Sequence, residues 1–231
     1  MPIVPEIQDR LLTAFPRSSN VSLFRAVQEG CFLASHLIEG EPFLNNSLGR
    51  DLHGHIRRVG ISYQIDLYCQ RGDLPFVTTM ARMPKGPLHW LEIKSTGARA
   101  HVCRVVEPRA FPDEAESRQD VRLTLQSDLL SWLDHGESRS LGRIIKVVPT
   151  LYAWLMFHAL PSGQIDQLSW GSPAADIDDW IGYIDVLQEI GRSAGDAPPT
   201  PPTPTPRDII RLRDHIAEQI EKNKKPDQED K

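Results

Sequence analysis

The chain has 231 residues and a formal net charge of −5, and apolar residues make up 40 % of it. This length suits one domain, or one domain with an appendage, and it is sufficient for a buried core. The acidic balance argues against a general attraction to nucleic acid or anionic lipid, although a local basic patch can still act. No stretch reaches the roughly 18 apolar residues that a membrane helix needs, so we expect a soluble protein.

The cysteines and the N-terminus indicate the compartment. Cys31, Cys69 and Cys103 are odd in number and far apart, which argues against a disulfide framework and against a zinc cluster. The opening MPIVPEIQDR lacks the cationic start and apolar block of a signal peptide. We therefore expect a cytoplasmic protein with buried free thiols, no metal site and no cofactor.

Two helices are predicted at the start of the chain. The first contains the apolar residues Ile7, Leu11, Leu12 and Phe15 and stops before Pro16. The second is expected to begin at Ser19 or Asn20, because a short polar side chain can accept a bond from a first-turn N–H, and to close at Gly40. Its predicted buried face contains Phe24, Val27, Cys31, Ala34 and Ile38.

The segment from residue 50 to residue 71 fits a strand by its β-branched residues and a helix by its spacing. The helical stripe consists of Leu52, Ile56, Val59, Tyr63 and Leu67. The length of about 20 residues favours the helix, and Gly72 stands where a left-handed C-cap belongs. Gly54 and Gly60 oppose this interpretation, since each costs about 1 kcal/mol inside a helix.

Strands are predicted next. They are Phe76–Met80, followed by Leu88–Ser95 and Arg99–Val106, which form a hairpin around Thr96 and Gly97. A two-residue turn pairs Ile93 with Ala100 on an apolar face and Glu92 with His101 on a polar one. A one-sided antiparallel sheet shows this division.

The second half of the body is predicted to add a polar helix-leaning stretch at 113–135 and strands at 144–148, 151–160 and 164–170. A helix from about Asp176 is then expected, with Asp178 and Asp179 complementing its N-terminal dipole. Its buried stripe consists of Ile177, Trp180, Ile181, Ile184 and Leu187. The expected fold class is α+β, with N-terminal helices, an antiparallel sheet and a C-terminal helix.

The sequence divides into a body at residues 1–192, a proline-rich linker at 193–206 and a tail at 207–231. The linker contains GDAPPTPPTPTP, which predicts an extended, polyproline-like spacer. The tail is expected to form an amphipathic helix capped by Thr205, with Ile209, Leu212, Ile216 and Ile220 along one side. Such a stripe docks on the body, on a second copy or on another protein; the alternative is an unfolded tail.

A basic helix face is a candidate binding site. Arg50, His53, Arg57 and Arg58 share or adjoin one face of the predicted third helix. Clustered cations hold phosphates, so this face is a candidate contact for nucleic acid or for an acidic partner. Asp51 lies inside the cluster, and an ordinary solvated face is the alternative.

Two catalytic hypotheses centre on the hairpin. Asp66 with Glu92 and Lys94 resembles the PD-(D/E)xK nuclease pattern, in which Mg²⁺ is the cofactor, but a helix at 50–71 removes Asp66 from the strand which that pattern requires. Alternatively, Glu92 orients His101 for general acid–base work, with Lys94, Arg99 and Arg104 nearby to hold an anion. An ordinary cross-strand charge pair explains Glu92 and His101 equally well.

The segment FLNNSLGRDLHGHIRRVGISYQIDLYCQRGDLPF with the following hairpin, roughly residues 40–112, resembles uncharacterised bacterial proteins of mobile-element, toxin–antitoxin or phage-defence loci. The resemblance implies a setting, and it includes no catalytic motif. We therefore expect an interaction component of such a system that acts through protein contacts, with nucleic acid as a further candidate ligand. The alternative is a nuclease or ribonuclease-type toxin, so the sequence leaves open whether the protein is an enzyme.

Overall fold

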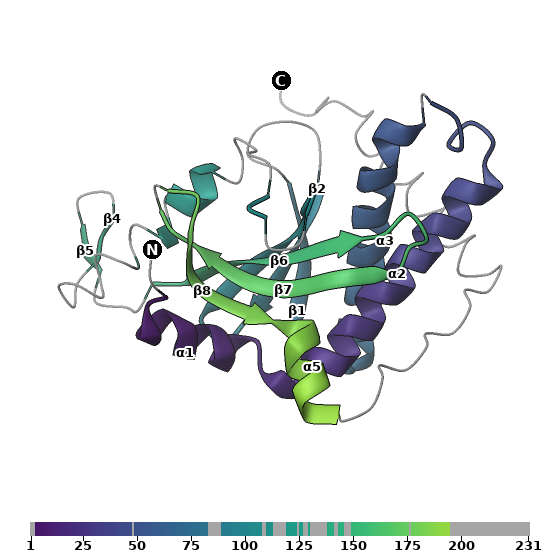
Figure 1. The fold of residues 1–231 in the computed structure, drawn as a ribbon. Helices are drawn as coiled ribbons and strands as arrows, with labels where there is room; N and C mark the ends of the chain where they lie inside the picture. Colours follow the sequence, from purple (N-terminus) through teal and green to yellow (C-terminus); the bar gives the residue numbers. More distant parts are fainter. Residues whose placement is uncertain are drawn as a thin grey trace, which may run out of the picture.

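The structure is a computed structural model, which describes residues 3–47, 49–82, 89–107, 110–112, 119–123, 125–126, 129, 138–140, 143–145, 149–175 and 177–194. Over these residues the chain has an α+β fold, with N-terminal helices, a six-stranded mixed sheet and a C-terminal helix (Figure 1). The predicted tail and nearly all of the predicted linker lie outside the described residues. Within them, no helix is both long enough and apolar enough to cross a membrane.

The three predicted N-terminal helices are confirmed. They are α1 (Pro5–Ala14), α2 (Asn20–Gly40) and α3 (Arg50–Arg71), with a short 3₁₀ turn, η1 (Arg17–Ser19), between the first two. Gly72 ends α3 with φ 81°, the left-handed conformation that the sequence predicted.

The predicted cap of α2 is wrong. The Ser19 hydroxyl donates to the Pro16 carbonyl at 2.7 Å, and neither Ser19 nor Asn20 provides a side-chain cap. The reason is that η1 runs directly into α2, so that Ser19 already has a right-handed helical conformation with φ −89° and ψ −10°. A residue in this conformation lacks the extended backbone that a capping side chain needs.

The crossing of α2 and α3 explains why one of the two glycines in α3, Gly60, is needed there. A Cβ added to Gly60 would lie 2.6 Å from the carbonyl oxygen of Gly30, and one added to Gly30 would lie 2.5 Å from Ile61 Cα. The two backbones are therefore in direct contact, which no larger residue permits. Figure 1 shows the two helices side by side.

The sheet has the strand order β1-β2-β3-β6-β7-β8. Its strands are β1 (Val77–Arg82), β2 (His89–Ser95), β3 (Ala98–Arg104), β6 (Leu151–Ala159), β7 (Ile165–Pro173) and β8 (Trp180–Asp185). All neighbours are antiparallel except β3 and β6, which are parallel. In the β2–β3 hairpin, Ile93 stands opposite Ala100 and Glu92 opposite His101, as the two-residue turn predicted.

A second sheet consists of β4 (Ser138–Ser140) paired antiparallel with β5 (Arg143–Ile145). The strand predicted at 144–148 corresponds in part to β5, and residues 146–148 lie outside the described residues.

The two faces of the main sheet bury different side chains. One face, with Leu91, Ile93 and Ala100, joins the helices in the largest apolar cluster, which also contains Ile61 and Ile65 of α3. The opposite face carries a second cluster of Cys103, Val105, Tyr152, Trp154 and Met156. The helices therefore cover one face, and aromatic side chains gather on the other.

The prediction of a helix from about Asp176 is wrong for residues 180–185. Residues Trp180–Asp185 form β8, which pairs with β7, and only Val186–Ala194 form a helix, α5. A spacing of three places Ile181 and Ile184 on one face of a helix, whereas in β8 the pairing irregularity beside Ile181 allows both to be buried. The β-branched and aromatic residues of this segment favour the strand.

The acidic residues before β8 do not line a helix start. Asp178 pairs with Arg122, and the Asp179 carboxylate accepts a bond from the Trp180 amide at 2.8 Å. The acid at the start of α5 is Asp185, whose Oδ1 accepts from the Gln188 amide at 2.9 Å. The prediction that Asp178 and Asp179 complement a helix dipole is therefore wrong, and Asp185 has that place at α5.

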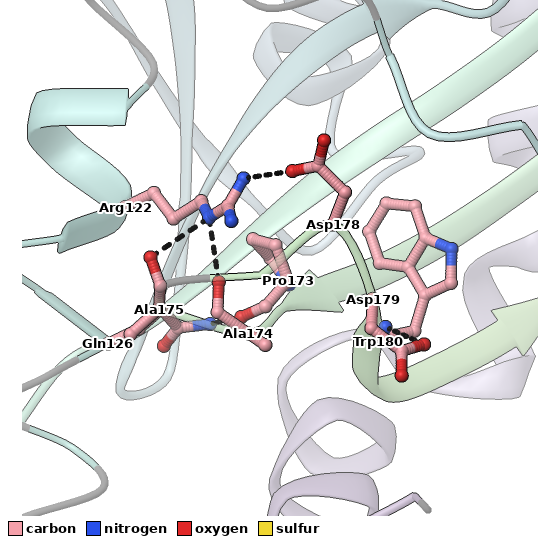
Figure 2. A network of polar contacts seen from close by, with 8 residues as sticks. All are labelled: Arg122, Gln126, Pro173, Ala174, Ala175, Asp178, Asp179 and Trp180. Atoms are coloured by element: carbon pink, nitrogen blue, oxygen red, sulfur yellow. Dashed lines mark hydrogen bonds and ion pairs between the residues drawn. The ribbon is translucent and has the colours of Figure 1, made fainter. Parts of the chain in front are cut away.

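Helical residues at 119–123 and 125–126 anchor the connection between β7 and β8 (Figure 2). The Arg122 Nε donates to the carbonyls of Ala174 (2.7 Å) and Ala175 (3.1 Å). Gln126 Nε2 lies 2.8 Å from the Pro173 carbonyl. Both side chains are buried, so this segment holds the loop that leads into β8.

Candidate functional site

An open cavity of about 590 Å³ lies between α1, β8 and α5. We call it the α1–α5 groove. Its apolar lining includes Leu12, Trp180 and Ile184, and its polar lining includes Arg17 and Glu189. Figure 1 shows α1 and α5 beside β8, at one edge of the sheet. The groove therefore lies where the described chain ends.

The edge of β8 beside the groove is occupied by the N-terminal segment. The Val4 amide donates to the Ile181 carbonyl at 2.9 Å. The Gln8 side chain bonds both backbone groups of Tyr183: its Nε2 donates to the carbonyl at 3.0 Å, and its Oε1 accepts from the amide at 2.8 Å. The Ile181 carbonyl and both backbone groups of Tyr183 are thus already hydrogen-bonded.

Two half-buried aromatic side chains, Trp180 and Tyr183, line the groove. The Trp180 ring packs edge-on against Trp154 with centroids 5.8 Å apart, and a Cβ added to Gly171 would lie 2.5 Å from that ring. The Tyr183 hydroxyl lies 3.2 Å from Gln167 Nε2, which donates to it. These contacts fix both rings before any ligand binds.

An ion pair is part of the groove lining. Arg17 Nε lies 2.6 Å from Glu189 Oε2, and its NH2 lies 3.3 Å from Oε1, so the pair has two contacts. Arg192 lies 3.5 Å from the same carboxylate. Together with Asp179 and Asp185, these residues give the groove a rim of both charges.

The structure brings Glu92 and His101 opposite each other but directs them to different partners. The Glu92 carboxylate lies 2.9 Å from Lys94 Nζ and 3.6 Å from Arg99. The His101 Nδ1 lies 2.9 Å from the Tyr152 hydroxyl, and its ring stacks on Trp90 with centroids 4.0 Å apart. His101 is 4 % exposed, so this imidazole belongs to the buried aromatic face.

The electrostatics of Glu92 follow from these neighbours. Partial burial raises the pKa of its carboxyl, but the Lys94 hydrogen bond and the charges of Arg99, Lys94 and His101 outweigh it. The net effect holds the pKa of Glu92 below its ordinary value, so Glu92 is a carboxylate at neutral pH. A carboxylate held in this way is suited to a structural pair.

The nuclease constellation is not assembled among the described residues. Asp66 accepts hydrogen bonds from Thr78 Oγ1 at 2.5 Å and from Gln70 at 2.7 Å, whereas Glu92 contacts Thr79. Consecutive strand residues point to opposite faces, so Asp66 and Glu92 lie on opposite sides of the sheet. Within the described residues, no three His, Cys, Asp or Glu side chains form a group that could hold a metal ion.

The predicted basic face lies on the N-terminal half of α3. Arg50 is exposed, while Arg57 donates to the Pro161 carbonyl at 3.1 Å and His53 Nε2 lies 2.8 Å from the Leu44 carbonyl. Arg58 NH2 lies 3.4 Å from Nδ1 of His55. Burial, together with the charge of Arg58, lowers the pKa of His55.

One further cation joins this face from the sheet. A Cβ added to Gly54 would lie 2.8 Å from Arg104 NH1, so the Arg104 guanidinium lies along α3 and on the face opposite to Arg99 and His101. We call Arg50, His53, Arg57, Arg58 and Arg104 the basic surface. The sequence grouped Arg104 with Lys94 and Arg99 of the hairpin instead, because its contact with α3 is not visible from local spacing.

The groove residues were not among the predicted site residues. Gln8 and Tyr183 are 175 positions apart, and no local pattern signals that they meet. The predicted tail contacts Ile209, Leu212, Ile216 and Ile220 lie outside the described residues. No family model, no curated protein and no solved structure matches the chain.

Proposed function

We propose that this protein is a binding component that docks a partner protein in the α1–α5 groove. The groove supports this because it combines rigidly held aromatic side chains with a charged rim. Aromatic and arginine side chains in concave sites contribute most of the binding energy at protein interfaces. Residues 207–223, with their predicted apolar stripe, are the second proposed contact. The setting that the resemblance implies, a bacterial stress or defence pair of toxin–antitoxin type, belongs to the same proposal.

The arrangement of the candidate catalytic residues favours binding over catalysis. Asp66 and Glu92 are separated by the sheet, and Glu92 is engaged by Lys94 and Arg99. His101 is buried between Trp90 and Tyr152. A general base needs contact with a substrate atom, and a buried imidazole stacked on an indole offers little access for one.

Co-purification tests the proposal. The tagged full chain is expressed in its native host, beside a groove variant that carries Tyr183→Ser and Gln188→Arg. A variant with Gln70→Arg, an exposed residue of α3, serves as the matched control. We expect a stoichiometric partner with the parent and the control, and its loss from the groove variant.

A growth assay distinguishes an enzyme from a binding component. If expression of the chain arrests growth and Glu92→Gln or His101→Ala alone relieves the arrest, the protein is a toxin-type enzyme and the binding proposal is wrong. Circular dichroism of each variant shows whether its fold is intact.

The basic surface supports a second candidate function, which is contact with nucleic acid. Arg104 adds a cation to the face that the sequence predicted on α3. Phosphate contacts make affinity fall as salt rises, because binding releases counterions. Arg50→Ala with Arg104→Ala is expected to weaken binding to a fluorescent duplex and to reduce the salt slope between about 50 and 200 mM. Arg71→Ala, at the far end of α3, is the control; equal slopes for all three proteins would exclude the surface.

A further inference from the structure

We propose that the α1–α5 groove takes a proline-rich segment in the polyproline II conformation, and that its resident occupant is the chain's own residues 198–206. This inference rests on the proposed docking role of the groove and names the ligand chemistry and the regulation of that site. The chain's own segment then acts as an internal competitor for a partner's proline-rich segment.

The closed edge of β8 decides which extended ligands are excluded. A β-strand ligand needs free backbone donors and acceptors on the strand that it joins. The Ile181 carbonyl is bonded to Val4, and the carbonyl and amide of Tyr183 are bonded to Gln8. The groove is therefore suited to a ligand that makes no backbone ladder. Proline has no N–H to satisfy, and a polyproline II helix has no internal or ladder hydrogen bonds.

The lining of the groove fits the side chains of such a ligand. Polyproline ligands bind by placing their rings in grooves lined by aromatic residues. Trp180 and Tyr183 are half-buried, and each is held by contacts on the sheet side, at Trp154 and Gln167. Rings fixed in this way lose little freedom on binding. Leu12 adds an aliphatic wall from α1.

The course of the chain places the occupant beside the groove. Residue Arg192 of α5 lines the groove, α5 ends at Ala194, and the first proline of PPTPPTPTP is Pro198. At about 3.1 Å per residue, the nine-residue segment 198–206 spans about 28 Å. So short a tether gives an effective concentration on the order of millimolar.

One charge beside this segment, that of Arg207, has acidic counterparts in the groove lining. Arg207 follows directly after the last proline, and the rim carries the carboxylates of Asp179 and Asp185. The predicted helix at 207–223 begins beyond the prolines, so residues 198–206 reach the groove first. This order favours the proline-rich segment over the tail helix as the occupant.

A cross-linking experiment on the full chain tests occupancy. Gln188→Cys, exposed at the groove, is combined with Thr203→Cys in a Cys69→Ser background, because Cys31 and Cys103 are buried. We expect a disulfide within one chain under mild oxidation. The matched control keeps both cysteines and replaces Pro199, Pro201, Pro202 and Pro204 with Ser, which leaves the tether length unchanged. Its cross-linking rate is expected to fall about tenfold.

Equal rates in the two proteins would overturn the inference, because tether length alone would then explain the contact. A disulfide formed only between two chains would also overturn it, since a second copy would then be the occupant. A pair at Asp73→Cys and Thr203→Cys, near the β1 edge of the sheet, reports the background rate of random encounter.

A peptide probe tests the ligand chemistry independently. A labelled peptide of residues 197–208, APPTPPTPTPRD, is titrated into the parent chain and into the Pro-to-Ser chain. We expect the Pro-to-Ser chain to bind the peptide about tenfold more tightly, because its groove is empty. Adding Tyr183→Ser and Gln188→Arg is expected to abolish this binding.

The outcomes separate the inference from the proposed function. If the peptide binds neither chain while the partner still depends on the groove residues, the proline-rich ligand is wrong and the docking role stands. If neither the peptide nor a partner depends on the groove, the proposed function fails as well. Equal peptide affinities for the two chains would disprove internal competition.

Discussion

At the scale of single residues, Arg122 illustrates how a buried cation can donate hydrogen bonds to backbone carbonyls. Its side chain is 7 % exposed, and it bonds two carbonyls of the β7–β8 connection as well as Asp178, which is 53 % exposed. The two carbonyls receive their hydrogen bonds from a buried guanidinium, whereas the Asp178 side chain is more than half exposed to solvent. The hydrogen bonds to the carbonyls should therefore contribute more to stability than the ion pair.

Replacing Arg122 tests this ranking. We expect Arg122→Ala to lower the free energy of unfolding by about 2–3 kcal/mol, because two buried carbonyls lose a charged donor. Asp178→Ala should cost less than about 1 kcal/mol, since its carboxylate is solvated. Urea denaturation followed by circular dichroism measures both values. A larger loss for Asp178→Ala than for Arg122→Ala would show that the ion pair dominates.

Glu92 gives a pH dependence whose sign follows from its lowered pKa. The unfolded carboxyl takes up its proton near the ordinary pKa of 4.5, whereas the folded one does so only at lower pH. The stability from Glu92 is therefore complete above about pH 4.5 and is lost as the pH falls through the lowered pKa. We expect the parent to lose more stability than Glu92→Gln between about pH 6 and pH 3. Urea titrations at both pH values measure the difference. Identical losses of stability would mean that Lys94 and Arg99 do not stabilise the Glu92 carboxylate.

At the scale of elements, local patterns were sufficient where the interaction is local. The stripe from Leu52 to Leu67 and the C-cap at Gly72 predicted α3, and the two-residue turn predicted the register of Glu92 with His101. The pattern was ambiguous at Trp180–Asp185, because alternation in β8 followed by the first turn of α5 imitates helical spacing. The parallel pairing of β3 with β6 has no local signal, since a crossover of more than 40 residues separates them.

In the candidate site, too, the features that depend on local contacts were predicted and those that depend on long-range contacts were not. The basic face of α3 was visible because Arg50, Arg57 and Arg58 are neighbours along one helix. The groove was not visible, because it depends on Gln8 meeting Tyr183 and on Arg17 meeting Glu189 across most of the chain. Contacts of this range are decided by packing, which single-sequence periodicity does not contain.

The crossing of α2 and α3 yields a prediction for Gly60. We expect Gly60→Ala to lower the free energy of unfolding by about 1–3 kcal/mol, because the new methyl group would overlap the Gly30 carbonyl and separate the helices. Gly40→Ala is the matched control, since a Cβ there meets nothing within 4 Å. It should be neutral, or stabilising by up to about 1 kcal/mol. Thermal denaturation measures both; similar shifts would mean that the helices do not touch at Gly60.

At the scale of the whole molecule, one apolar cluster joins the N-terminal helices, the sheet and α5. It contains Ile7 of α1, Ile61 of α3 and Ile190 of α5, and its Trp170 ring stacks on Phe15 at 3.9 Å. Elements that share one core lose their packing together. The body should therefore behave as a single cooperative unit.

Coincident unfolding probes would confirm this cooperativity. We expect tryptophan fluorescence and far-ultraviolet circular dichroism to give the same urea midpoint, because burial of Trp170 and the helices depends on the same cluster. Loss of helical signal at lower urea than the fluorescence change would indicate that α2 and α3 melt separately.

The two edges of the sheet differ, and the difference limits how the molecule can polymerise. The outer side of β8 is covered by Val4 and Gln8, whereas β1, among the described strands, pairs only with β2 and exposes Val77 (64 %) and Met80 (44 %). A sheet with one usable edge can be extended only once. Edge-to-edge association would therefore stop at a closed, two-fold pair, because a growing fibril needs two free edges on every subunit. By covering β8, the N-terminal segment leaves the sheet only one edge at which another strand could add.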